Sequence, residues 1–417
     1  MHVGHLGYQS YVRLARRLEQ YVPGAFPSDT LCEILKVLVT EEEAGLLALM
    51  PLRGVSLERV AAVWGMSREE ALERLESVAG KGVVYAFGTG AEKRYLLAPP
   101  VLGFVEFSLM RTDGKFDSEL LSRLYHQYCQ IEGDFIRQQG SAHPALARVF
   151  AEEETLGEVA SEVLTHDRVS AGIDGAACIT VGLCYCRHKM QHLGLACDAP
   201  QETCLTFNDV AAYLAENGIA RVISREEAQR IVRDCMARGL VQIGDNKRGA
   251  LAIICNCCGC CCDVLQGYKR FGGTGLVSPS AFVAAIRADT CSACGTCEAR
   301  CPVGAITTAG GRPAVDGGVC LGCGVCARFC ETGSCHMRLR PERPFVPEDM
   351  IEKMVMAAID TGKIGNFIFD DQRSRAHALL RRAVNGSLRL PGLKRLLLQP
   401  PVIGRIVRSV RGGEVER

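Results

Sequence analysis

The sequence has no long apolar run. No stretch of about 18 uncharged apolar residues occurs, so a transmembrane helix is not expected. Neither charge is in excess, with 48 Lys+Arg against 47 Asp+Glu, which argues against a globally basic surface for nucleic acid. The first residues, Met1–Tyr8, lack the basic and apolar regions of a signal peptide. We therefore expect a cytoplasmic protein.

Nucleotide-binding and hydrolytic motifs are also absent. No G-x-G-x-x-G run follows a predicted strand and no P-loop occurs, so dinucleotide binding and ATP-driven chemistry are not expected of this chain. Asp174-Gly175 and the run 272–275 are better explained as turns. No Ser–His–Asp or Cys–His signature can be assigned, and the sequence therefore predicts no catalytic residue.

Cysteine is abundant, with 23 among 417 residues. A cytosolic chain keeps its thiols reduced, so dense cysteine in such a chain indicates metal binding or redox chemistry. Only Cys32 and Cys129 precede residue 170, and none follows Cys335. The cysteines thus divide the chain into a head, a Cys-rich middle and a tail.

Two four-cysteine runs share the spacing C-x2-C-x2-C-x3-C, and Pro302 follows the first run. In such a pair, three thiolates of one run bind one [4Fe–4S] cube and its fourth thiolate binds the other cube. The predicted ligands of the first cluster are Cys291, Cys294, Cys297 and Cys330. Those of the second cluster are Cys320, Cys323, Cys326 and Cys301. A pair of zinc sites is the alternative, but zinc ribbons use two separated C-x2-C pairs.

These eight ligands resemble those of the bacterial dicluster ferredoxins. Small residues between the ligands, such as Gly295 and Gly322, allow backbone N–H groups to approach the sulfides. The second run has Glu331 where that family usually has proline. A carboxylate at this place would disfavour adding an electron to the nearby cluster.

A further group of cysteines precedes these runs. Six lie within Cys255–Cys262 and five more lie between Cys178 and Cys204. Neighbouring side chains on a strand point to opposite faces, so the six cannot all point inward. The candidate metal ligands are Cys184, Cys186, Cys197, Cys204, Cys255, Cys257, Cys258, Cys260, Cys261 and Cys262. They fit a further iron–sulfur cluster shared by the two stretches, a dithiol–disulfide relay, a thiolate site for zinc or another metal, or plain structural cysteines.

Basic side chains accompany this Cys-rich stretch. His188 and His192 are four residues apart, which on a helix places both on one face. They are metal ligands or proton carriers, or ordinary surface or core histidines. Arg187 and Lys189 either stabilise the negative charge of a cluster or are solvated.

The succession of 182–208 (GLCYCRHKMQHLGLACDAPQETCLTFN), 254–262 (ICNCCGCCC) and two ferredoxin runs is similar to a family of bacterial proteins known mostly as 4Fe-4S dicluster-domain proteins. The resemblance covers nearly the whole chain and includes the head segment 98–111. It implies iron–sulfur electron transfer and names no substrate.

The predicted fold is α+β and multidomain. Helical periodicity at 31–50, a helix at 56–65 capped by Ser56 and a helix opened by a Ser67–Glu70 capping box precede two strands within 83–99, the order of a winged helix. In the middle, capping and glycine signals predict helices at 208–218 and 224–239. The predicted domains are a winged-helix-like head (1–110), a helical connector (111–171), a Cys-rich domain (172–280), a ferredoxin domain with two [4Fe–4S] clusters (281–341) and a helical, basic tail (342–417).

The charge of the head argues against nucleic-acid binding. Residues 31–100 contain eight Lys+Arg and ten Asp+Glu. The third predicted helix, which would be the recognition helix, carries four glutamates against two arginines: Glu69, Glu70, Glu73, Glu76, Arg68 and Arg74. Such a helix would repel phosphates, on which DNA affinity largely depends. We expect a protein-docking use of this fold.

The tail is strongly basic, since residues 372–413 contain ten Arg+Lys and no Asp or Glu. Interleaved Leu, Ile and Val would let it rest on an anionic membrane surface or dock an acidic partner. The plainer alternative is a helix that packs on its own protein with a solvated basic face.

The sequence thus favours an iron–sulfur electron-transfer protein that passes electrons to or from a partner oxidoreductase, rather than an enzyme. Two alternatives stay open. One is a redox-sensing transcriptional regulator that acts through the head. The other is an oxidoreductase with an unusual cluster in the Cys-rich middle.

Overall fold

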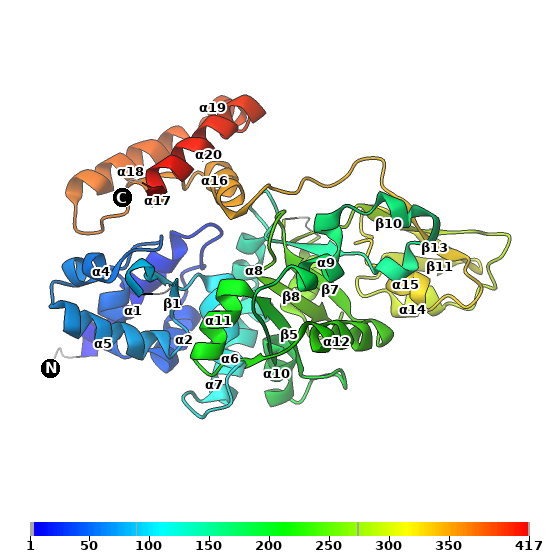
Figure 1. The fold of residues 1–417 in the computed structure, drawn as a ribbon, viewed down its shortest axis with the longest axis horizontal. Coiled ribbons are helices and arrows are strands. Elements are labelled where there is room, and N and C mark those ends of the chain that lie inside the picture. Colours follow the sequence, from blue (N-terminus) through cyan, green and yellow to red (C-terminus); the bar gives the residue numbers. More distant parts are fainter. Residues whose placement is uncertain (1–3, 89, 273–274, 416–417) are drawn as a thin grey trace. The chain divides into compact units, whose positions relative to one another are not determined.

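The computed structural model describes residues 4–88, 90–272 and 275–415. The chain divides into two compact units, one formed by residues 1–144 with 347–417 and the other by residues 145–346 (Figure 1). Helices and sheets are both present, as the α+β prediction requires. Among the described residues, no helix combines the length and apolar character needed to span a bilayer. The finer division into five domains stays a prediction.

The first unit begins with five helices and a hairpin. These are α1 (Gly4–Glu19), α2 (Asp29–Leu38), α3 (Glu41–Leu47), α4 (Leu57–Trp64), α5 (Arg68–Ala79), β1 (Val84–Phe87) and β2 (Arg94–Leu97). The prediction of one helix over 31–50 is wrong, because Thr40 forms a capping box with Glu43 and starts α3. The predicted cap at Ser56 and the box of Ser67 with Glu70 are confirmed.

Short helical elements continue this unit, and its last part is the tail. The elements are α6 (Val105–Leu109), α7 (Ser118–His126), α8 (Asp134–Gln139), α16 (Met350–Asp360), α17 (Gly365–Ile368), α18 (Arg375–Ser387), α19 (Pro391–Leu397) and α20 (Pro400–Val415). The tail is helical, as predicted. It has an apolar core of its own around Val355, Ile359, Leu388, Ile403 and Val407.

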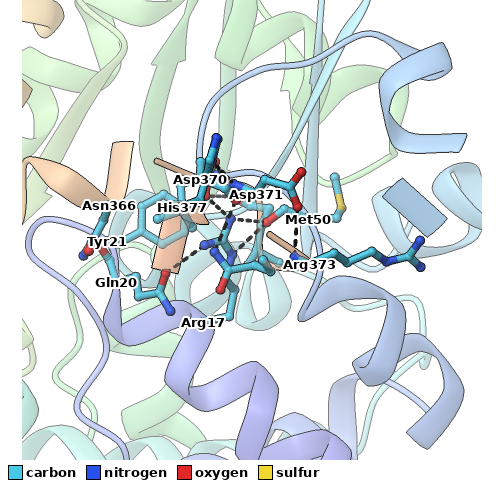
Figure 2. Close-up of polar contacts among 12 residues, drawn as sticks. Arg17, Gln20, Tyr21, Met50, Asn366, Asp370, Asp371, Arg373 and His377 are labelled. Atoms are coloured by element: carbon cyan, nitrogen blue, oxygen red, sulfur yellow. Dashed lines mark hydrogen bonds and ion pairs between the residues drawn. The ribbon is translucent and has the colours of Figure 1, made fainter. Parts of the chain in front are cut away.

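A buried ion pair joins head and tail within this unit (Figure 2). Arg17 of α1 pairs with Asp370, and only 1% and 6% of the two side chains are exposed. Arg17 also donates to the carbonyl oxygen of Met50, and the Asp370 Oδ2 atom accepts a bond of 2.7 Å from the backbone N–H of Leu52. Burial raises the pKa of Asp370, and the guanidinium of Arg17 opposes this increase.

The second unit is built on a seven-stranded sheet in the order β6-β4-β5-β8-β7-β3-β9. Neighbouring strands are antiparallel except for β3 and β9, which are parallel. The strands are β3 (Ala147–Phe150), β4 (Ile179–Leu183), β5 (Glu202–Phe207), β6 (Arg221–Val222), β7 (Val241–Asp245), β8 (Ile253–Cys257) and β9 (Val277–Ser278). The segment 111–171 was predicted to be helical, so the sequence missed β3.

We call residues 147–278, which contain this sheet, the sheet domain. Its helices are α9 (Val169–Asp174), α10 (Tyr185–His192), α11 (Asn208–Glu216), α12 (Arg225–Ala237) and α13 (Asp263–Phe271). The two predicted helices at 208–218 and 224–239 are confirmed as α11 and α12. Of the predicted turn at 272–275, Gly272 has φ +59°, whereas residues 273–274 lie outside the described residues.

Two antiparallel strand pairs and two short helices follow. They are β10 (Phe282–Ile286) with β13 (Cys335–Leu339), β11 (Ile306–Ala309) with β12 (Arg312–Val315), α14 (Thr296–Arg300) and α15 (Val325–Arg328). We call residues 282–339 the cluster module. Its buried Phe282 and Met337 share one hydrophobic core with Val241 and Leu265 of the sheet domain. The sheet domain and the cluster module therefore pack as parts of one unit.

Candidate iron–sulfur and thiolate sites

The cluster module contains a cavity lined by four cysteines. They are Cys301, Cys320, Cys323 and Cys326. The remaining lining is mostly apolar and includes Ala284, Val303 and Ile306. Cys301 lies at the end of α14, and the other three precede or belong to α15. The fourth cysteine of the first run therefore lies with the first three of the second run.

The other four cysteines of the two runs differ in their exposure. Cys297 is buried, Cys291 and Cys330 are half-buried, and Cys294 is exposed. The segment after Cys330 lies beside the start of the first run, because Ser334 Oγ donates to Thr290 Oγ1 at 3.0 Å. The pairing of β10 with β13 holds these two segments together.

Backbone N–H groups point at the sulfurs of this module. Ala305 N–H donates to Cys301 Sγ at 3.1 Å, and Cys335 N–H donates to Cys330 Sγ at 3.2 Å. Ala293 N–H approaches Cys291 Sγ at 3.4 Å, with Ala293 itself at φ +55°. Such N–H donors stabilise negative charge on sulfur, so the donor set suits thiolates bound to iron.

One glycine of the second run is required by close packing. A Cβ at Gly322 would lie 2.0 Å from the carbonyl oxygen of Phe282, and its φ is +69°. Any larger residue would push the loop between Cys320 and Cys323 away from β10. The small residue thus positions the cavity-lining cysteines.

The candidate ligands of the Cys-rich middle divide into two groups. β8 ends at Cys257, and a turn leads from Cys258 to α13, whose N-cap is Cys262. The six-thiol group contains Cys184, Cys186, Cys204, Cys255, Cys257 and Cys262. The four-thiol group contains Cys197, Cys258, Cys260 and Cys261. Consecutive cysteines in 255–262 thus belong to different groups.

The six-thiol group is a chain of hydrogen-bonded sulfurs in which four cysteines are buried and Cys184 and Cys255 are half-buried. Burial alone would raise the pKa of Cys186, but hydrogen bonds from Cys184 and Cys262 and the charge of Lys189 lower it well below its ordinary value. Hydrogen bonds from Cys204 and Cys257 likewise lower the pKa of Cys255, against the opposing effect of burial. The other thiols of the group act as hydrogen-bond donors to these two sulfurs. The bond that Cys262 donates to Cys186 is the largest cause of the raised pKa of Cys262. Cys186 and Cys255 are therefore the two thiols of this group whose pKa is lowered.

Two fully buried cations face these sulfurs. Lys189 forms an ion pair with Asp263, and Arg187 donates to the carbonyl oxygen of Asn256 at 2.9 Å and to Thr203. No salt bridge of Arg187 with a carboxylate occurs in the described part of the chain, and its buried Nε has no hydrogen-bond partner there. Burial opposes the charge of Arg187, but the thiolates around it raise its pKa. The sulfurs therefore take the place of a carboxylate partner for Arg187, whose Nη1 donates to Cys258 Sγ at 3.9 Å.

The four-thiol group lies between the loop after α10 and the turn before α13. Cys258 and Cys261 are buried, Cys197 is half-buried and Cys260 is exposed. All four Sγ atoms lie within 4.8 Å of one another. A hydrogen bond from the Cys261 thiol, assisted by the charge of Arg187, lowers the pKa of Cys258 to about 4, although burial opposes this.

Several polar residues of the site were not predicted, because they belong to no sequence motif. Asp263, Asn256 and Thr203 hold the two buried cations in place. Only the position of Asp263 directly after Cys262 could have indicated its role. The predicted pairing of His188 with His192 on one helix face is confirmed, since their Nε2 atoms lie 3.2 Å apart. Neither histidine belongs to the four-thiol group.

A comparison with protein families supports the first run. A family model described as a 4Fe-4S binding domain matches residues 284–307, which include Cys291, Cys294, Cys297 and Cys301. Comparisons with curated proteins and with solved structures found no match. The chain thus contains a ferredoxin-type 4Fe-4S binding module, which makes it an iron–sulfur protein.

Proposed function

We propose that this chain is an electron-transfer protein with two [4Fe–4S] clusters in the cluster module, and that it passes electrons to or from a partner oxidoreductase. The main observation in support of this proposal is the cavity lined by Cys301, Cys320, Cys323 and Cys326. Its lining supports the crossed ligand assignment, because Cys301 comes from the other run. When bound, such clusters accept and release single electrons.

The ligands of the other proposed cluster are Cys291, Cys294, Cys297 and Cys330. The exposure of Cys294 makes this side of the module accessible to a redox partner. The similarity to bacterial 4Fe-4S dicluster-domain proteins, with the segments at 182–208 and 254–262, agrees with this role. The basic tail is a second candidate surface, for an acidic partner or an anionic membrane.

We also propose that the six-thiol group binds a further iron–sulfur cluster. Six thiols in one group, four of them buried, exceed the need of packing, and the buried Arg187 and Lys189 would compensate the negative charge of a cluster. The group is near the cluster module, because its Cys257 and Cys262 belong to the same buried core as Cys320 and Cys323. An unusual cluster there would also suit the alternative of an oxidoreductase.

The test uses the full chain, purified without oxygen, because the shared core means that neither half of the second unit is expected to fold alone. We expect more than about eight irons per chain in the wild type, since two cubes account for eight. Cys257→Ser should lose the excess iron and sulfide and keep the paramagnetic signals of the two cubes. The control Cys178→Ser, a half-buried cysteine outside both groups, should lose nothing. If the wild type contains eight irons and Cys257→Ser contains the same number, the proposal of a further cluster is wrong. The disulfide and zinc interpretations of these cysteines would then remain.

The regulator alternative makes a different prediction. Arg68 and Arg74 of α5 are engaged by Glu58 and Glu42, whereas the glutamates of this helix face solvent. We therefore expect the intact holoprotein to bind DNA no tighter than about 10⁻⁶ M at physiological salt. A gel-shift titration against random and genomic fragments measures this. Nanomolar, sequence-specific binding would favour the redox-sensing regulator.

A further inference from the structure

We propose that the four-thiol group holds one tetrahedrally coordinated metal ion, zinc or ferrous iron, separate from any iron–sulfur cluster. Its ligands are Cys197, Cys258, Cys260 and Cys261. The proposal goes beyond the electron-transfer function and does not depend on it, because the site shares no cysteine with the cluster module or with the six-thiol group.

The separations of the sulfurs select a single ion. Metal–thiolate bonds of about 2.3 Å in a tetrahedron place the sulfurs about 3.8 Å apart. Here Cys197 Sγ lies 3.6 Å from Cys258 Sγ and 3.8 Å from Cys261 Sγ, and Cys260 Sγ lies 3.7 Å from Cys261 Sγ. An iron–sulfur cube has four irons between its cysteines, which separates their sulfurs to roughly 6 Å. The group is therefore too compact for a cube and has the dimensions of a tetrathiolate site.

The cluster module provides an internal comparison. In the part of the chain that the structure describes, the four-thiol group is the one set of three or more Cys, His, Asp or Glu side chains in which the donor atoms come this close together. The eight cysteines of the two runs, all within the described residues, form no such set. The short separations thus distinguish this group from ligands arranged for cubes.

The surroundings suit a negatively charged complex. Four thiolates around one divalent cation leave two negative charges. Arg187 Nη1 lies 3.9 Å from Cys258 Sγ. The backbone N–H of Cys261 donates to Cys258, and that of Cys197 donates to Cys261. These donors would stabilise thiolates that remain partly exposed at Cys260.

The ion would join two segments without regular structure. Cys197 lies in the loop between α10 and β5, and the other three ligands lie in the turn between β8 and α13. Cys197 and Cys258 are 61 positions apart in the chain. A metal bridge between them would fix the turn that contains Gly259, which packs on Pro302 of the cluster module.

The test is metal and sulfide quantitation on the full chain, purified anaerobically and dialysed against a chelator, with X-ray absorption at the zinc and iron edges. We expect one zinc per chain surrounded by four sulfurs at about 2.3 Å. If the chain instead contains one more iron than acid-labile sulfide, the same site holds iron in place of zinc. After dialysis, the content of this ion in Cys260→Ser should be lower than in the wild type by roughly tenfold or more, and its sulfide content should be unchanged. Because Cys260 is exposed, this variant should fold.

Cys178→Ser is the matched control and should keep the ion. Cys197→Ser is a second ligand variant, which removes the ligand of the other segment and should also lose the ion. Loss of iron together with an equal amount of sulfide in Cys260→Ser would overturn the proposal in favour of a cluster. Unchanged metal content in both ligand variants would also overturn it, as would a metal-free wild type in which thiol titration finds these four cysteines oxidised.

Discussion

Replacing Cys330 by alanine is expected to destroy the cluster proposed for Cys291, Cys294 and Cys297 and to spare the cluster proposed for the second run. The reason is the position of the last cysteine of each run. Cys301 lines the cavity of the second run. The loop after Cys330 lies beside Thr290, which directly precedes Cys291. Removal of Cys330 therefore takes away one of four thiolates and leaves an open iron corner.

The measurement is electron paramagnetic resonance of the reduced, anaerobically purified protein with iron quantitation. The spectrum of Cys330→Ala should match that of Cys294→Ala and differ from that of Cys323→Ala, and each variant should lose up to about four irons. The control is Cys335→Ala, which removes a buried thiol nearby while its backbone N–H still donates to Cys330. A Cys330→Ala spectrum that matches Cys323→Ala would mean that each run binds its own cube.

Replacing Asp370 by asparagine is expected to destabilise the first unit by about 3 to 5 kcal/mol, because one member of a buried ion pair is left uncompensated. Arg17 is 1% exposed and would keep its charge without its carboxylate partner. Asparagine retains the shape of the residue and a hydrogen-bond acceptor for Leu52 N–H, so the loss reports mainly on charge. Figure 2 shows this carboxylate directed at the guanidinium.

Trp64 offers the measurement, since it is the one tryptophan of the sequence and is buried in the same unit. Its fluorescence during urea unfolding gives the free-energy change. The matched control is Asp371→Asn, because Asp371 pairs with Arg59 at 3.8 Å and both side chains are at least one-third exposed, so less than about 1 kcal/mol should be lost. Adding Arg17→Met to Asp370→Asn should recover part of the loss. Equal effects of the two asparagine variants would contradict the argument.

Local patterns were predicted where the interactions themselves are local. The caps at Ser56 and Ser67 bond to residues three positions away, so the sequence alone contains both partners. The same holds for His188 and His192 on one face of α10. The prediction of one helix over 31–50 failed because apolar periodicity continued through Thr40, whose capping box starts a new helix. Strand β3 was missed because its pairing partners, β7 and β9, lie about 95 and about 130 residues further along the chain.

The sequence by itself indicated an iron–sulfur module, because the spacing within a four-cysteine run decides which thiolates can bind the same cube. Only the tertiary structure decided how the other cysteines are grouped. Cys257 and Cys258 are neighbours in the chain, but the strand ends between them, and the turn sends them to different groups. Likewise, Arg17 and Asp370 are 353 positions apart, and nothing local relates them. Contacts of this kind depend on which surfaces the packed core brings together, and no spacing rule contains that information.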